Sequence, residues 1–131
     1  MIVSTTAPQQ HLDENQLRNI YLKRIYLDSA GHALVPVNLP PGNALRKAFL
    51  HATLHMSDAQ MQDYWNRRYF QGVSPPYVLA SQTAVVQFVA KTPGAIGYVL
   101  ACRATPGVKI VARLDVPRPA TDVGDCSTDS P

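Results

Sequence analysis

Four residues that can cap a helix each precede a helix-like segment, and apolar strand-like runs lie between most of these segments. This alternation constrains the fold more than any other feature of the sequence. Each of the four residues, Asp13, Asn43, Ser57 and Ser81, precedes a segment whose apolar side chains recur at helical spacing. Chains in which helices and strands alternate fold as α/β domains. The sequence therefore predicts the α/β class.

Two of the helix starts carry a second signal, because Asp13 and Ser57 are each followed by a glutamine three residues later, which completes a capping box. Phe49 and Trp65 are expected to be buried where two consecutive helices pack. Pro36 is expected near the start of its strand or on an edge of the sheet, since proline has no N–H to donate. The predicted helices are 13–23, 43 to about 55, 57–72 and 81 to about 91, and the predicted strands are 2–5, 33–37, a short run within 74–80, 94–101 and 108–114.

The composition indicates one globular domain. The chain has 131 residues, of which 46% are hydrophobic, and this is enough to bury a core. Its net charge of +3 comes from scattered basic residues, so no nucleic-acid partner is predicted. No run reaches the roughly 18 apolar residues that suggest a membrane span, so no membrane insertion is expected. From Pro117 the composition changes to Pro, Asp, Ser and Thr, which divides the chain into a domain, 1–116, and a tail, 117–131.

The two ends of the chain leave the cellular compartment open. The first residues, MIVSTTA, lack the basic and long apolar regions of a signal peptide. The protein is therefore either cytoplasmic, or exported with its leader absent from this sequence. Cys102 and Cys126 fit a disulfide that fastens the tail in an oxidising compartment, and they fit two unpaired thiols equally well.

No pattern in the sequence predicts catalysis, a cofactor or a metal. His51 and His55 are one helical turn apart, as in some zinc sites, but the glutamate of the H-E-x-x-H motif is missing. Lys47 lies on the same stripe one turn earlier, so a solvated helix face is the favoured interpretation. No G-x-S-x-G motif occurs, and the acidic pair Asp13 and Glu14 is explained by the helix start. We therefore expect a protein that is not an enzyme.

A strand, a tight loop and a helix start follow one another in VNLPPGNALRKAF, residues 37–49. This order suits an oxyanion, because the first N–H groups of a helix have no partner within the helix. Arg46 is expected one turn into the helix, able to swing toward an anion, although the Asn43 side chain can satisfy the same N–H groups. The candidate anion site comprises Asn38, Gly42, Asn43, Ala44, Leu45 and Arg46.

Four stretches of the chain resemble the second lobe of phosphate-binding proteins from ABC uptake systems. SQTAVVQFVAKTPGAIGYV is similar to the capped helix and the T-P-G-A-I-G-Y-V strand near the end of that lobe. LDENQLRNIYLKRI is similar to the lobe's opening helix, and LVPVNLPPGNALRKAF falls where the phosphate loop sits. MSDAQMQDYWNRRYFQG is similar to small, single-lobe relatives of the family. The resemblance covers Leu12 to Leu114.

The resemblance implies a fold and a compartment. The fold would be a single lobe of a type II periplasmic binding protein, with a mixed sheet of about five strands flanked by helices. Export to the periplasm is implied, with the leader removed, and with it a disulfide between Cys102 and Cys126. Gly94 and Gly97 would maintain the lobe by letting a buried strand pass close to its neighbours.

The chain departs from these relatives at the phosphate loop. The relatives present an arginine and a Ser-Gly-Thr cluster there, whereas this chain has NLPPGNA, residues 38–44, in which two prolines donate no N–H. Lys23 stands where the relatives have a glycine at the end of the opening helix. This sequence also holds one lobe, and one lobe offers half of a cleft.

Two functions are therefore expected as alternatives. The first is a non-enzymatic, solute-binding-like module of the periplasm that binds phosphate or another small oxyanion at most weakly. The second is a protein–protein interaction or adaptor domain that reuses the former cleft face. A polar concavity beside residues 38–46 would favour a solute, and an exposed apolar patch would favour a partner.

Overall fold

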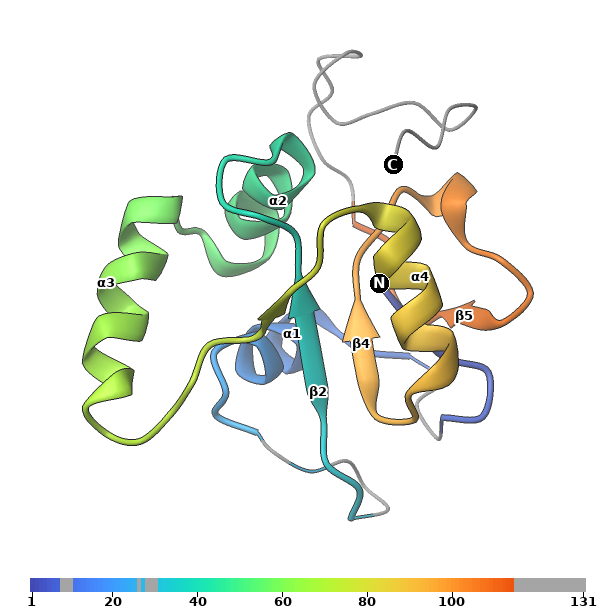
Figure 1. Ribbon diagram of the computed structural model, residues 1–131, viewed down its shortest axis with the longest axis horizontal. Helices are drawn as coiled ribbons and strands as arrows, with labels where there is room; N and C mark the ends of the chain where they lie inside the picture. The colour runs from blue at the N-terminus through green and yellow to red at the C-terminus, as the bar shows by residue number, and fades with distance from the viewer. Residues whose placement is uncertain (8–10, 26, 28–30, 115–131) are drawn as a thin grey trace.

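The computed structural model describes residues 1–7, 11–25, 27 and 31–114 (Figure 1). Cys126, the predicted tail and the boundary before it lie outside the described residues, so the disulfide between Cys102 and Cys126 stays a prediction. In chain order the elements are β1 (Ile2–Ser4), α1 (Glu14–Tyr21), β2 (Val35–Asn38), α2 (Ala44–Phe49), the π-helix η1 (Leu50–Leu54), α3 (Asp58–Tyr69), β3 (Tyr77–Val78), α4 (Gln82–Lys91), β4 (Ala95–Gly97), the 3-10 helix η2 (Ala101–Arg103) and β5 (Val108–Ile110).

The five strands form one mixed sheet in the order β3-β2-β4-β1-β5. β2 is parallel to β3 and β4, whereas β1 is antiparallel to β4 and β5. Ile2 of β1 lies opposite Gly97 on one side and opposite Ile110 on the other. In Figure 1, α4 passes in front of the sheet and α1 lies behind it. The predicted α/β class, with a mixed five-stranded sheet flanked by helices, is confirmed.

All four predicted helix starts are present. The side chains of Asp13, Asn43, Ser57 and Ser81 each accept a hydrogen bond from the backbone N–H three residues later. At Asp13 and Ser57, Oε1 of the capping-box glutamine also accepts a hydrogen bond from the N–H of the cap residue itself. In the part of the chain that the structure describes, no helix is long and apolar enough to cross a bilayer.

The helix that starts after Asn43 changes type before it ends. α2 continues into the π-helix η1, and His55 ends the segment in a left-handed conformation with φ +56°. The predicted extent, to about residue 55, therefore holds, but the last turn is wider than an α-helical turn.

Aromatic side chains fill the core between the sheet and its helices. Phe49 stacks on Tyr98 with ring centroids 4.1 Å apart and meets Tyr21 edge-on at 4.8 Å. Trp65 is buried and meets Tyr64 edge-on at 4.9 Å. Phe49 and Trp65 are both buried as predicted. Phe49, however, packs on Tyr98, just after β4, and on Tyr21 of α1, whereas its expected place was between two consecutive helices.

Gly94 and Gly97 lie where the backbone passes very close to its neighbours. A Cβ at Gly97 would stand 2.6 Å from Cγ1 of Val85, on α4, which is closer than real contacts allow. At Gly94 the φ angle is +92°, and a Cβ would stand 2.2 Å from the carbonyl oxygen of Ala33. Both glycines therefore maintain the packing of β4, as the sequence predicted.

Pro36 lies in an interior strand, where a missing N–H could weaken the sheet. It is the second residue of β2 and is opposite Ile96 of β4, whereas β3 pairs with β2 from Val37 onward. Proline therefore occupies the start of the strand, before the pairing with β3 begins, which is one of the two places expected for it.

Lys23 follows the end of α1 in a left-handed conformation, with φ +59°. Its N–H donates to the carbonyl of Ile20 at 3.1 Å. Glycine adopts this conformation most readily because it has no Cβ, so a lysine here holds a strained backbone.

Candidate functional site

The parallel strands β2, β3 and β4 end at one edge of the sheet, and the predicted anion loop, 38–46, starts there. Ligands of open α/β sheets commonly bind at such an edge. Asn38 is buried, and its Oδ1 accepts hydrogen bonds from the Leu39 N–H and from the Tyr98 hydroxyl. Its carbonyl accepts the Leu79 N–H at 2.8 Å. Asn38 therefore ties the strand ends together and faces inward.

The hydroxyls of two buried tyrosines, Tyr21 and Tyr98, form hydrogen bonds with the backbone at this edge. The Tyr98 hydroxyl also accepts the Leu39 N–H at 3.1 Å, and the Tyr21 hydroxyl donates to the Val37 carbonyl at 2.8 Å. Burial raises the pKa of Tyr98 and the pKa of Tyr21 above the ordinary value for a phenol. Both hydroxyls are therefore neutral donors at physiological pH.

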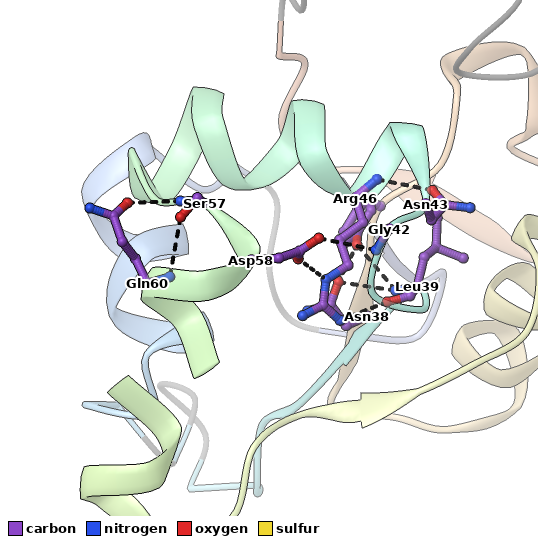
Figure 2. Close-up of polar contacts among 9 residues, drawn as sticks. Asn38, Leu39, Gly42, Asn43, Arg46, Ser57, Asp58 and Gln60 are labelled. Atoms are coloured by element: carbon purple, nitrogen blue, oxygen red, sulfur yellow. Dashed lines mark hydrogen bonds and ion pairs between the residues drawn. The ribbon is translucent and has the colours of Figure 1, made fainter. Parts of the chain in front are cut away.

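Arg46 lies inside the protein, with a side chain that is 10% exposed. Its Nη1 donates to the Leu39 carbonyl at 2.9 Å, and its Nε donates to Oδ1 of Asp58 at 2.9 Å (Figure 2). The expectation that Arg46 could swing toward an external anion is wrong, because burial and two fixed acceptors hold the guanidinium against the loop.

The carboxylate of Asp58 bridges the loop and the arginine. Its Oδ2 accepts the Gly42 N–H at 3.0 Å, while its Oδ1 accepts from Arg46 (Figure 2). Ser57 caps α3 and so fixes Asp58 at the first position of that helix. Backbone N–H groups and guanidinium groups are the donors with which proteins hold oxyanions. The anion in this loop is therefore a side chain of the protein itself.

Most of the other predicted site residues also have partners within the chain or are buried. The Asn43 side chain accepts the Arg46 N–H at 3.0 Å, and the Asn43 N–H donates to the Pro40 carbonyl at 3.1 Å. Leu45 is buried and Ala44 is half-buried. The structure thus brings the predicted residues together in one loop and first helical turn.

Sequence reasoning missed Asp58, the residue that decides what this loop can do. An acidic residue just after a Ser57 cap is fully explained by the start of a helix, so it carries no separate signal. The short connection between η1 and α3, 55–57, keeps the start of α3 close to the end of η1, but no local pattern pairs Asp58 with Arg46.

An apolar hollow of about 240 Å³ opens beside α2 at the same edge of the sheet. Its walls come from α2, from the chain after β4, and from β5 with the residues that follow it. The main apolar residues in these walls are Leu45, Phe49, Tyr98, Leu100, Ile110 and Leu114. Leu100, Ile110 and Leu114 are half-buried, so part of this apolar surface is open to solvent.

A wider hollow of about 670 Å³ is lined by Asp58 and by three basic residues, Lys47, His51 and His55. Nε2 of His55 is 3.3 Å from Oε1 of Glu14. Among the described residues, no three His, Cys, Asp or Glu side chains gather in a way that could hold a metal ion.

The comparison with known proteins does not place the chain in a family. No protein-family model matches it, and no curated protein is similar enough to count as a relative.

Proposed function

We propose that the chain is a non-enzymatic, solute-binding-like module of the periplasm that binds phosphate or another small oxyanion at most weakly. We also propose that it is related to one lobe of the phosphate-binding proteins of ABC uptake systems. The sequence resemblance supports the relationship and the compartment, and the mixed sheet is consistent with such a lobe. The observation that carries the proposal is the Asp58 carboxylate, which engages the Gly42 N–H and the Arg46 guanidinium.

An external phosphate would have to displace Asp58 before it reached these donors. A hydrogen bond to a charged group contributes roughly 1.5–3 kcal/mol. Phosphate would replace two such bonds that are already made, beside a carboxylate of like charge. Millimolar binding corresponds to about 4 kcal/mol, and the net gain stays near or below that value. We therefore expect a Kd no tighter than the high-micromolar range.

Titration calorimetry with phosphate at low salt tests this proposal. Asp58→Ala should bind phosphate about tenfold or more tightly than the unmodified protein, because Arg46 and Gly42 lose their internal anion. Asp63→Ala is the matched control, since Asp63 is exposed on the same helix. A sub-micromolar affinity of the unmodified protein would show that the loop is an open phosphate site, contrary to the proposal.

A protein–protein interaction domain is the second candidate, and the apolar hollow beside the loop supports it. Its volume of about 240 Å³ suits one or two apolar side chains of a partner. Leu100→Glu places a charge in this wall and should abolish the capture of a partner from a periplasmic extract. Tyr69→Glu is the control, because Tyr69 is an exposed apolar residue on α3, away from the hollow. Equal capture by both variants would exclude the hollow as the interface.

A further inference from the structure

Two large aromatic side chains are exposed where α3 ends. Phe70 is 87% exposed and Tyr69 is 71% exposed, the two highest values among the large hydrophobic residues that the structure describes. The two rings meet edge-on with their centroids 5.8 Å apart. In Figure 1, α3 stands at the outer edge of the molecule, on the side away from α4. Adjacent exposed apolar side chains of this size are typical of an interaction surface.

The chain that follows α1 is fixed beside this end of α3. The Tyr64 hydroxyl donates to the Leu22 carbonyl at 2.7 Å, and Nη2 of Arg68 donates to the Lys23 carbonyl at 3.3 Å. Both donors belong to the second half of α3, so the two segments are side by side. Together they form one surface, called here the α3-end surface, which comprises 22–25 and 67–70.

The charge of the α3-end surface is positive. Its two stretches contain no acidic residue and four basic ones, namely Lys23, Arg24, Arg67 and Arg68. Arg24 and Arg67 are exposed. Arg67 is three positions before Phe70, so the two side chains are neighbours at the helix end. Asp63, one turn before Arg67, is exposed as well, and it leaves the surface with an excess of positive charge.

Exposed aromatic rings beside cations match the surface of an anionic lipid bilayer. Amphipathic aromatic side chains favour the headgroup level of a bilayer, and basic residues are attracted to anionic headgroups. A fluid surface also accepts a protruding ring such as that of Phe70 without a matching pocket. A second copy of the chain fits less well, because a two-fold contact through this surface would bring the same cations face to face.

We propose that the α3-end surface docks the protein on an anionic phospholipid membrane. Tyr69 and Phe70 lie at headgroup level in this arrangement, and Arg24 and Arg67 contact the headgroups. This is docking at the surface of the bilayer, and it requires no helix that crosses it. The surface is separate from the loop 38–46, so the inference goes beyond the function proposed for that loop and does not depend on it.

Co-sedimentation of the full chain with vesicles at low salt tests this inference. The expected result is binding to vesicles that mix phosphatidylcholine with phosphatidylglycerol, and much weaker binding to phosphatidylcholine alone. Raised salt should weaken the binding, because it screens the exposed charges. Phe70→Ser should weaken it about tenfold or more, since the apolar ring is lost. Arg67→Gln should weaken it about fivefold.

Two variants serve as matched controls and should leave the affinity unchanged. Tyr77→Ser removes an aromatic residue that is 64% exposed on β3. Lys91→Gln removes an exposed cation from α4 and so changes the net charge as Arg67→Gln does. All four substituted side chains are exposed, so each variant should keep the fold, and its thermal unfolding is measured in parallel.

Four results would overturn the inference. Failure to bind the mixed vesicles would exclude a lipid surface and leave a protein as the occupant. Equal losses in Arg67→Gln and Lys91→Gln would mean that net charge alone attracts the chain to the vesicles. Equal binding to both kinds of vesicle would exclude a role for the cations. Vesicle-free dimers that Phe70→Ser abolishes, seen in sedimentation velocity, would assign the surface to a second copy of the chain.

Discussion

Two regions of this protein carry cationic side chains in a concave setting, and they differ in what faces the charge. In the loop 38–46, Arg46 and the Gly42 N–H share the carboxylate of Asp58. A cavity of about 290 Å³ beside α4 is lined in part by Lys91, which is exposed to solvent. The loop follows a strand and precedes a helix, as in an anion site, but its donors already bind the Asp58 carboxylate. Lys91 is solvated, so it requires no internal anion. Burial of the cation therefore decides whether the protein must supply an anion of its own.

The N-terminal amine of Met1 is a further cationic group, and it is buried. It donates to the Ala112 carbonyl at 2.9 Å, a neutral acceptor. Burial, and then the positive charge of Arg113, lowers the pKa of the Met1 amine from 8.0 to about 6. An amine can release its proton when it is buried, whereas a guanidinium cannot, so Arg46 requires a carboxylate.

The largest expected effect comes from removing the anion of the loop. Removing one partner of a fully buried ion pair costs roughly 3–5 kcal/mol. The Asp58 side chain is 27% exposed, so Asp58→Ala should lower the free energy of unfolding by about 2–4 kcal/mol. Urea unfolding measures this, with Asp63→Ala expected to change stability by less than about 0.5 kcal/mol. Equal urea midpoints for the two variants would show that solvent alone satisfies Arg46, and that the buried arginine does not require the Asp58 carboxylate.

The second effect is a pH dependence, for a chain that begins at Met1 with a free amine. Between about pH 6 and pH 8.0 the amine is neutral in the folded state and protonated in the unfolded state. The unfolded state then binds more protons, so stability rises as the pH rises through this window, by at most about 2–3 kcal/mol. Urea midpoints across the window measure the rise, and a chain with an acetylated amine should lose it. A rise of the same size in the acetylated chain would assign it to other groups.

A smaller effect should follow when Lys23, just after the end of α1, is changed. Lys23→Gly should raise the free energy of unfolding by roughly 1 kcal/mol, because glycine takes φ +59° without the strain of a Cβ. Lys23→Ala removes the same charge and keeps the strain, so it should give no such gain. Phosphate binding should be unchanged in both variants. Altered binding would mean that net charge, and not the contacts of the loop 38–46, governs the affinity.

The smallest expected effect on stability is that of Lys91→Ala. Lys91 is exposed at the end of α4, so its removal should change the free energy of unfolding by less than about 0.5 kcal/mol. Thermal unfolding measures this change. A large loss of stability would show that Lys91 has a structural role comparable with that of Asp58.

Much of the fold could be predicted because its signals are local in sequence. The caps at Asp13, Asn43, Ser57 and Ser81 act on N–H groups three residues away, so each can be recognised without knowing the rest of the structure. The order of the strands is not local. Nothing within 2–4 indicates that β1 lies between β4 and β5.

In the candidate site, too, the residues that are close in sequence could be predicted and the distant one could not. The donors of the loop, Gly42 and Arg46, are neighbours in sequence and could be predicted as a group. Their acceptor, Asp58, belongs to the next helix, and only the packing of α3 against the loop makes it the ligand. The cavity beside α4 joins residues 82–91 to residues 103–105 across an intervening strand. Such a cavity has no signature in one sequence, because each half resembles an ordinary polar surface.

The position of β1 also determines when the domain can fold. A ribosome makes Ile2 and Val3 first, and their partners in β4 and β5 are made last. Until 95–97 and 108–110 have emerged, the first strand of a nascent chain has no native neighbour, and contacts between such distant segments form slowly. The sheet of the described residues is therefore complete only after nearly all of them have been synthesised. A chain that stops before Val108 would leave one side of β1 open to association with other chains.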